Sequence, residues 1–407
     1  PGGGLIGVYG LITFHRGRVE ERFFGEVEEV IHRWQERTGG EYIEPPAPLK
    51  RYLLRDWTWN FGVANWSPDF SVAARRALFF YDRSGADPVD GVIAIDFAAL
   101  EELLASLGPV EVGGYGVDVD SANVTEEVLT RIGKDQRQGE QPHAFAQAVA
   151  REMVDSASAV DSGKLASLLG ALDRLAGEKH LFLYAADRQL QNSLRGLGWA
   201  GEVKTEPGDY LMAVNASVHS TKLNLVLDER MRLDIQLDAQ GKARHAVTLS
   251  YENQLSEWAQ GRDPQVVSDL MLSGFYGGYL RLLVPPQAWL LDLHLNGQAV
   301  GAEDITQEIG KASFGRYFPL PKDRRAALRF IYEVPAVVDI SQGDHEYRLL
   351  IQKQPGSRAV PLRIAIGLPS GARAKSVSLD GQPLPDSPLE IETELSVDRA
   401  LVVRYEL

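Results

Sequence analysis

The sequence contains no cysteine, and this absence excludes disulfide bonds, thiolate metal sites and cysteine nucleophiles together. It also lacks any apolar run near the ~18 residues that a membrane-spanning helix requires. Positive charge is scarce, because 42 Lys and Arg residues stand against 56 Asp and Glu residues, for a formal net charge of -14. No basic tract stands out, so the sequence excludes a general polyanion binder and predicts no nucleic-acid partner. A local cationic pocket for one phosphate group remains compatible with this balance.

The motifs of several enzyme classes are missing as well. The chain contains no HExxH pair, no GxSxG segment and no kinase signature. The three glycines at positions 2–4 fit neither the dinucleotide-binding pattern nor the P-loop. Four histidines show no metal spacing, and we interpret them as ordinary polar or half-buried residues: His143, His180, His219 and His294.

What is present is typical of a folded, multidomain protein. With 407 residues, 44% of them apolar and 24% charged, the chain has enough material for two or three domains with real cores. It begins with PGGGLIGVYG, without a Met or a signal peptide. We therefore expect a fragment that begins just inside a domain, with any membrane anchor lying upstream.

The first part of the sequence alternates between strand and helix patterns. A buried strand is predicted at residues 5–14 and a helix at 20–36, and further strands and helices alternate up to residue 214. This alternation predicts an α/β layered domain over residues 1–232. Residues 110–119 read as a hairpin within it.

The sequence pattern changes after about residue 231, where short stretches of alternating apolar and polar residues separated by turns replace the helical periodicity. This pattern predicts an all-β sandwich over residues 233–407, formed either as one unit or as two small subdomains. One helix near residues 264–274 interrupts it. The predicted strands cover residues 244–251, 279–284, 288–295, 325–334, 346–353, 361–367, 374–379, 389–393 and 400–405.

The stretch at residues 53–70, LLRDWTWNFGVANWSPDF, carries the densest mixture of aromatic and polar side chains. It holds three of the seven Trp residues, Trp57, Trp59 and Trp66. We predict an ordered loop that links a strand to a helix. A loop of this kind indicates either a functional site or an internally satisfied polar loop under an aromatic lid.

Six polar side chains fall in predicted loops at strand ends of the first domain: Arg55, Asp56, Asn65, Asp69, Asn215 and Lys222. In an open α/β sheet, binding sites gather beyond the carboxyl ends of the strands. Arg, Lys and amide groups suit a phosphate or pyrophosphate, and two carboxylates beside them suit Mg²⁺. An Arg–Asp pair is also a common structural ion pair, so the structural alternative stays open.

Several ordered segments carry a resemblance to a known family. They are GGGLIGVYGLITF, LRDWTWNFGVANWSPDF, VDGVIAIDFAALEELLASLGPVEV and LMAVNASVHSTKLN, followed by YGGYLRLLVP and YRLLIQKQPG. In these segments the chain resembles the bacterial family named domain of unknown function four-zero-one-two over nearly its whole length. This resemblance implies little about function, because the family is largely uncharacterised.

That family resembles, more remotely, the LytR–CpsA–Psr phosphotransferases. Those are membrane-anchored, extracytoplasmic α/β enzymes that bind a polyprenyl pyrophosphate and transfer its glycopolymer to the cell wall with Arg, Asp and Mg²⁺. The resemblance implies that Arg55 and Asp56 match the family's Arg–Asp pair. The segment KDQRQGEQPHAFAQAV resembles its Arg-rich helix start, which implies Arg137 as a further phosphate ligand. The family's Arg-x-Asp-Thr signature is replaced here by glycines 2–4.

Three hypotheses follow. The first is a cell-envelope protein that binds a polyprenyl-linked pyrophosphate glycan and transfers it. In that case the catalytic residues would be Arg55, Asp56 and Asp69. Phosphate would be held by Arg55, Lys222, Asn215, Asn65 and Arg137, while Asp56 and Asp69 would hold Mg²⁺ or orient an acceptor. The second is a non-enzymatic surface scaffold or glycan-binding or protein-binding module with a degenerate site, which the missing signature favours. The third is a phosphatase or pyrophosphatase that uses the same residues.

Overall fold

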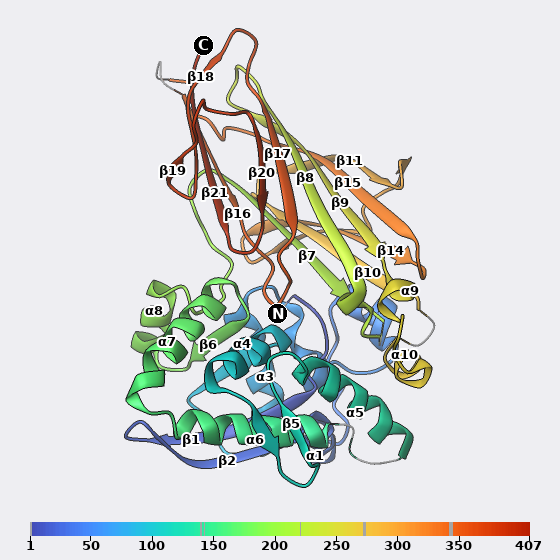
Figure 1. Ribbon diagram of the computed structural model, residues 1–407. Helices are drawn as coiled ribbons and strands as arrows, with labels where there is room; N and C mark the ends of the chain where they lie inside the picture. Colours follow the sequence, from blue (N-terminus) through green and yellow to red (C-terminus); the bar gives the residue numbers. More distant parts are fainter. Residues whose placement is uncertain (1, 139–140, 142, 220, 272–273, 342–344) are drawn as a thin grey trace. The chain divides into compact units, whose positions relative to one another are not determined.

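The computed structural model describes residues 2–138, 141, 143–219, 221–271, 274–341 and 345–407. The chain divides into two compact units (Figure 1): Pro1–Glu202 with Gly261–Leu272, and Val203–Gln260 with Ser273–Leu407. The division therefore falls between Glu202 and Val203, whereas the sequence analysis placed the domain boundary after residue 232. The reason is strand pairing over long distances in the sequence, since the strand Asp209–Ser217 hydrogen-bonds with strands of the second unit.

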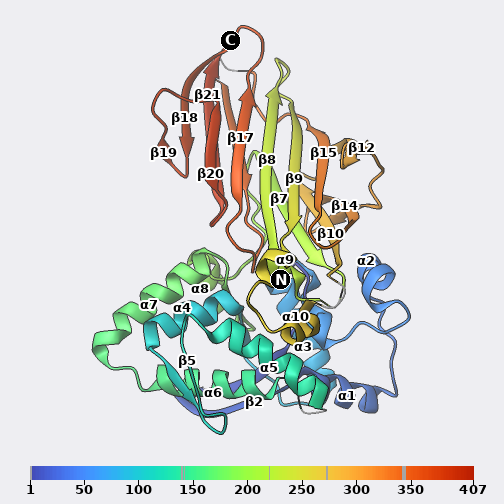
Figure 2. The ribbon, with the colours of Figure 1, turned by 45° about the vertical axis from the view of Figure 1, so that its right-hand side comes forward.

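The first unit is a mixed α/β body in which helices predominate, as the sequence predicted in coarse form. Four of its helices begin at an aspartate whose side chain accepts a hydrogen bond from the first turn, which is the preferred N-cap chemistry. Helix α10 lies beside α5 (Figure 2). The helices are α1 (Val27–Thr38), α2 (Ala47–Leu49), α3 (Phe70–Arg83), α4 (Phe97–Leu107), α5 (Val124–Gln138), α6 (Ala144–Ser158), α7 (Ser162–Gly177), α8 (Arg188–Gly196) and α10 (Pro264–Met271).

The strands of this unit form three separate antiparallel pairs among the described residues, in place of the predicted open layered sheet. The layered α/β prediction is therefore wrong in its sheet, because none of these pairs is parallel and none carries a crossover helix. The pairs are β1 (Val8–His15) with β2 (Arg18–Glu26), β3 (Gly91–Ile95) with β6 (Leu181–Ala185), and β4 (Val110–Val112) with β5 (Val117–Val119).

The hairpin β1–β2 corrects two further predictions. The helix expected from residue 20 begins at Val27, because Phe23 lies in β2 opposite Leu11 instead of on a helical face. The strand expected to be buried, β1, keeps most of its side chains at least partly accessible. The core of this part of the unit lies beyond the hairpin, where Val30, Trp34 and Phe80 are fully buried.

The second unit contains two large sheets that pack as a sandwich. It is one compact unit and not two small subdomains. The eight-stranded sheet has the order β13-β14-β10-β7-β16-β21-β18-β19 and the seven-stranded sheet the order β12-β11-β15-β9-β8-β17-β20. Aromatic rings join the two sheets, as where Tyr251 stacks on Phe318 with 4.8 Å between ring centroids. The helix expected near residue 264 forms as α10 and belongs to the first unit.

The sandwich strands follow the predicted alternation closely. Along β8, for example, Met231, Leu233 and Ile235 are buried while the residues between them are accessible. The strands of the eight-stranded sheet are β7 (Asp209–Ser217), β10 (Tyr276–Val284), β13 (Asp304–Glu308), β14 (Lys311–Leu320), β16 (His345–Ile351), β18 (Arg373–Leu379), β19 (Gln382–Pro383) and β21 (Arg399–Glu406). Those of the seven-stranded sheet are β8 (Leu227–Leu237), β9 (Ala243–Asn253), β11 (Trp289–Leu295), β12 (Gln298–Ala299), β15 (Arg325–Val334), β17 (Pro361–Gly367) and β20 (Glu390–Glu394).

Two short helical segments complete this unit, η3 (Leu223–Val226) and α9 (Leu255–Trp258). Within the described ranges, no helix of either unit combines the length and apolar character needed to span a membrane.

Candidate functional site

The Trp-rich stretch at residues 53–70 contains two short helical turns and is not a simple loop. A π-helical turn, η1 (Lys50–Leu54), leads into it, and a 3-10 segment, η2 (Phe61–Trp66), precedes α3. The element before η1 is α2, so the predicted preceding strand is wrong. Prolines at positions 45, 46 and 48 explain this, because they favour a short helical start and disfavour strand pairing.

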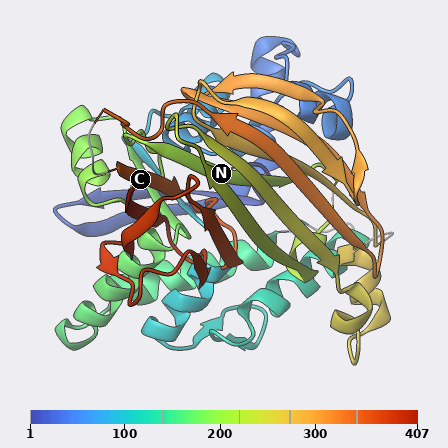
Figure 3. The ribbon, with the colours of Figure 1, turned by 90° about the horizontal axis from the view of Figure 1, so that it is seen from above.

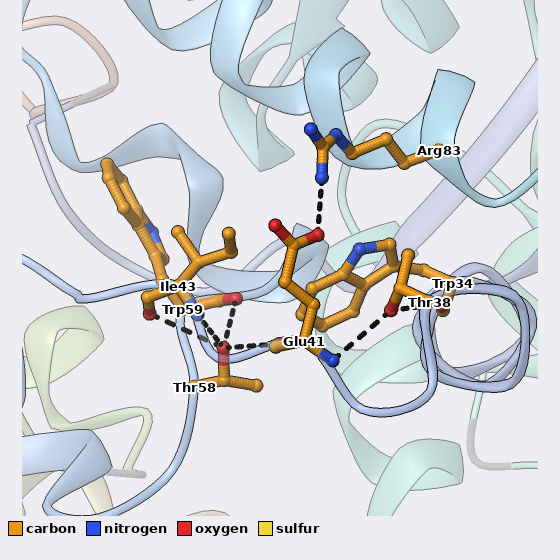
Figure 4. A network of polar contacts seen from close by, with 7 residues as sticks. All are labelled: Trp34, Thr38, Glu41, Ile43, Thr58, Trp59 and Arg83. Carbon is orange, nitrogen blue, oxygen red and sulfur yellow. Dashed lines mark hydrogen bonds and ion pairs between the residues drawn. The ribbon is translucent and has the colours of Figure 1, made fainter.

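Internal hydrogen bonds hold the middle of this stretch (Figure 4). The hydroxyl oxygen of Thr58 accepts a hydrogen bond from the Ile43 amide at 2.8 Å and lies 3.3 Å from the carbonyl oxygen of Trp59. The indole of Trp59 donates to the Val63 carbonyl at 3.0 Å. The guanidinium of Arg76 covers the Trp59 ring, with 4.3 Å to its centroid. These contacts favour the internally satisfied polar loop over a ligand-binding one.

The predicted catalytic pair lies at the surface. The side chains of Arg55 and Asp56 are exposed, and in the described part of the chain neither makes a hydrogen bond or ion pair. Arg55 adopts φ 54° and ψ -108°, a strained conformation for a residue with a side chain. Trp57 beside them is 73% exposed. The structure thus gives this pair no charge partner with which to shape a phosphate site.

Asp69 and Asn65 lie deeper and have structural partners. Asp69 is 6% exposed, and its carboxylate accepts the Val72 amide at 3.0 Å to cap α3. The Asn65 carbonyl accepts the Gly3 amide at 3.1 Å, whereas its side-chain oxygen is buried and has no hydrogen-bond partner in the described part of the chain. The glycines at the start of the chain therefore pack along the Trp-rich stretch.

Substitutions at Asp69 test whether its carboxylate stabilises the protein by capping α3. We expect Asp69→Ala to lower the free energy of unfolding by about 1 kcal/mol, because the first turn of α3 loses its cap. Asp69→Asn should keep most of that stability, since its amide oxygen still accepts the Val72 amide. Urea denaturation of both variants measures the difference, and equal losses in the two variants would contradict a capping role.

Two other predicted phosphate ligands belong to the sandwich and not to the first domain, which corrects their predicted setting. Asn215 lies within β7, and Lys222 immediately precedes η3. Burial lowers the pKa of Lys222 below its ordinary value. Arg137 is part of α5, but its side chain lies outside the described residues.

Asn215 is part of an inward-facing, partly buried polar cluster that sequence reasoning missed. Glu229 and Tyr251 lie directly opposite each other on β8 and β9 and face the sandwich interior. Burial raises the pKa of Glu229 to about 7, while the neighbouring Tyr251 hydroxyl acts in the opposite direction. Burial also raises the pKa of Tyr276, against a lowering effect of its hydrogen bond with Asn215. An acid at an inward position of an alternating strand was the signal that could have revealed this cluster.

Two histidine–carboxylate pairs occur in the first unit, although both histidines looked ordinary in the sequence. His143 Nδ1 lies 2.8 Å from the Glu26 carboxylate, and His180 Nδ1 lies 2.6 Å from Asp96. Among the described residues, Glu26, Glu28 and His143 form the one group of three side chains whose ligand atoms are close enough to hold a metal ion. Asp56 and Asp69 are not part of such a group, and Mg²⁺ at those residues remains a prediction.

A hollow lies on the outer face of the seven-stranded sheet. It has a volume of about 510 Å³, and small side chains form its floor on neighbouring strands, namely Ala246, Ala365 and Gly367. Among the strands of this sheet, β8 and β9 are yellow-green to yellow in Figure 3, β15 is orange, and β17 and β20 are red. The absence of a side chain at Gly367 is required, because a Cβ there would meet the Gln236 side chain at 2.0 Å.

Polar side chains surround this hollow, and some of them already form ion pairs with neighbouring residues while others do not. Asp234 is held by Arg232 at 2.7 Å. Arg244 and Arg329 are exposed, and neither makes a hydrogen bond or ion pair with another residue in the ranges described. Two available guanidinium groups beside one hollow form a local cationic site on a chain of net negative charge.

The strand register fixes how far apart the two arginines lie. Arg329 is directly opposite Thr248, and Arg244 lies four residues further along the same strand as Thr248. Their backbones are therefore separated by about 13 Å along the strand direction and by one strand across the sheet. Such a spacing suits an extended ligand with anionic groups at intervals better than a single small anion.

Comparisons with known proteins give a family for the first third of the chain. Residues 1–132 match the family described as Protein of unknown function (DUF4012). The resemblance of the later segments to this family remains a prediction. No curated protein matches the chain.

Solved structures resemble parts of the chain weakly. A "putative nutrient binding protein" from Legionella pneumophila is 11% identical over 48% of this chain and 71% of its own, with a TM-score of 0.30. An M1 zinc metallopeptidase from Deinococcus radiodurans is 15% identical over 44% of this chain and 42% of its own, with a TM-score of 0.23. Leukotriene A4 hydrolase from Saccharomyces cerevisiae is 9% identical over 44% of this chain and 29% of its own, with a TM-score of 0.25. The chain spans less than half of either enzyme, and at these TM-scores the likenesses carry no argument about function.

Proposed function

We propose that this protein is a non-enzymatic binding module for an acidic glycan, which it holds on the outer face of the seven-stranded sheet. The observation that carries this proposal is the pair of guanidinium groups of Arg244 and Arg329, which make no hydrogen bond or ion pair among the described residues and lie beside a hollow of about 510 Å³. Its lining includes two alanines, Ala246 and Ala365, whose short side chains leave the sheet surface between them low enough to approach. The arginines supply charge where the ligand is negative.

The chemistry of the rim supports a glycan in particular. Arginine forms planar two-point contacts with carboxylate or phosphate groups. Asp234, Gln236 and Glu390 add carboxylate and amide groups that can exchange hydrogen bonds with sugar hydroxyls. The mixture of acidic and basic groups would repel a densely charged polyanion, so the proposed ligand carries isolated anionic groups on a polyhydroxyl chain.

Binding is better supported than transfer. A transferase would need Arg55, Asp56 and Asp69 to act together, yet the first two are exposed without charge partners and the third caps a helix. A polyprenyl pyrophosphate carrier, similarity to the LytR–CpsA–Psr enzymes, an extracytoplasmic location and a membrane anchor remain predictions. They would place the module near the glycans of the cell envelope.

The experiment is a binding titration with three probes: a largely methyl-esterified oligogalacturonide with isolated free carboxylates, a neutral oligosaccharide carrying one phosphate monoester, and an unmodified neutral cello-oligosaccharide. We expect one of the two acidic probes to bind and the neutral probe not to bind. The variants Arg244→Gln and Arg329→Gln should each weaken binding roughly tenfold, because each removes a charged hydrogen bond worth about 1.5 kcal/mol. The affinity should also fall with added salt.

Arg325→Gln is the matched control. Arg325 points to the same face of β15 as Arg329, but it already pairs with Glu252 at 2.9 Å. It should leave the affinity unchanged. An equal loss in this control, equal binding of the neutral probe, or no binding of any probe to the folded protein would overturn the proposal.

A further inference from the structure

We infer that Glu26, Glu28 and His143 form a divalent metal site in the first unit, a role distinct from glycan binding on the sandwich. Their ligand atoms lie within 4.8 Å of one another. Glu26 ends β2, Glu28 lies in the first turn of α1, and His143 immediately precedes α6. An ion bound there would join segments that are 117 residues apart in the sequence.

The charge balance of this group calls for a cation. Glu26 is only 5% exposed, and in the described part of the chain its one ion-pair partner is His143, not a Lys or Arg. A second carboxylate, Glu28, adds negative charge at close range. A buried carboxylate such as that of Glu26 needs a paired charge, and one imidazole cannot neutralise it together with the nearby, exposed Glu28. A divalent ion would balance both.

The surroundings already orient the ligands as an outer shell does in metal proteins. The Glu26 carboxylate accepts hydrogen bonds from the His143 backbone amide at 3.0 Å and from the Gln147 side chain at 2.9 Å. The imidazole packs against Gly7, where a Cβ would lie 3.3 Å from His143 Nε2. Hydrogen-bonded carboxylates and a fixed ring orientation are the usual supports of metal ligands.

The donor set selects the kind of metal. One imidazole nitrogen with two carboxylate oxygens suits Zn²⁺, Mn²⁺, Fe²⁺ or Co²⁺. Mg²⁺ and Ca²⁺ prefer oxygen ligands alone. Glu28 is exposed, so one side of the ion would remain open to water. The site would therefore be able to hold a water molecule or a ligand oxygen besides its three protein ligands.

The test uses the whole protein, stripped with a chelator and titrated with Zn²⁺ and with Mg²⁺ by calorimetry, and with Co²⁺ by visible absorption. We expect one Zn²⁺ per chain, a rise in the unfolding temperature on binding, and Mg²⁺ binding at least tenfold weaker. His143→Gln and Glu28→Gln should each weaken Zn²⁺ binding at least tenfold and change the Co²⁺ spectrum. Gln147→Leu should weaken it by about 10–100-fold through the orientation of Glu26.

His180→Gln provides the control, because His180 also pairs with a carboxylate, Asp96, but lacks a third ligand. It should leave the affinity for Zn²⁺ unchanged. Because Glu28 lies at the surface, Glu28→Gln tests the site even if His143→Gln fails to fold. Absence of stoichiometric Zn²⁺ in the folded protein, or an equal loss of affinity in His180→Gln, would overturn the assignment and leave Glu26 and His143 as a simple ion pair.

Discussion

Glu229→Gln is expected to stabilise the protein by as much as about 3 kcal/mol at pH 8 and to leave its stability at pH 4.5 nearly unchanged. Glu229 faces the sandwich interior, where burial raises the pKa of its carboxyl group from 4.5 to about 7. Above that pH the folded protein must hold a negative charge that is shielded from water and has only the Tyr251 hydroxyl acting in its favour. Glutamine has the same shape and never carries the charge.

The direction in which stability changes with pH follows from proton binding. Between pH 4.5 and about 7 the folded state holds a proton on Glu229 that the unfolded state has lost. The stability of the wild-type protein should therefore fall as the pH rises through this window, by about 1.4 kcal/mol per pH unit. Above pH 7 both states are ionised at this residue, and its contribution becomes constant. In Glu229→Gln this slope should be absent.

Urea denaturation at several pH values between 4.5 and 8.5 measures the effect. Glu392→Gln is the matched control, because the Glu392 side chain is 80% exposed on β20 and should not change the pH dependence. Parallel stability curves for the wild type and Glu229→Gln would show that Glu229 titrates normally in the folded protein. That result would also remove the reason to regard its cluster with Tyr251 as a strained polar site.

The sequence predicted the sandwich well, because its signal is local. Alternation with period two specifies which side of a strand is buried, and β9 follows it from Ala243 to Asn253 without interruption. Signals of this kind need no knowledge of distant parts of the chain.

The grouping of the strands into units could not be predicted in the same way. Strand β7 pairs in parallel with β16, so that Leu211 lies opposite Ile351. Nothing in the local pattern of β7 distinguishes this partner from a strand of the first domain. The predicted phosphate ligands Asn215 and Lys222 were assigned to the wrong domain for this reason.

The candidate sites were hidden for a related reason. The residues that rim the hollow occupy outward positions of four strands, and each of them alone reads as an ordinary solvent-facing side chain. Only the register of β9 and β15 brings Arg244 and Arg329 to one face. In the Trp-rich stretch the middle is held by internal hydrogen bonds, at Thr58 and Trp59, whereas the Arg55 and Asp56 side chains are exposed.

Asp209→Ala is expected to cost about 3–5 kcal/mol of stability, the largest loss of any substitution considered, because it breaks a fully buried charge network between the two sheets. Asp209 is 1% exposed, and one of its oxygens lies 2.7 Å from His245 Nε2 and accepts the Tyr347 hydroxyl at 2.8 Å. Its other oxygen accepts the Tyr210 amide at 2.8 Å. His245 is itself fully buried and stacks on Tyr332, so water cannot replace the lost carboxylate.

The loss of the Asp209–His245 contact should also affect the proposed glycan site, because His245 lies between Arg244 and Ala246 on β9. Asp209→Ala should therefore weaken glycan binding as well as stability, whereas Arg244→Gln should weaken binding alone. The control is Asp228→Ala, which removes the exposed ion pair with Arg230 and should cost less than about 1 kcal/mol. Thermal and urea denaturation compare the two variants. A loss in Asp209→Ala as small as in Asp228→Ala would mean that the buried network contributes little, and that the sheets are held together by their apolar and aromatic contacts alone.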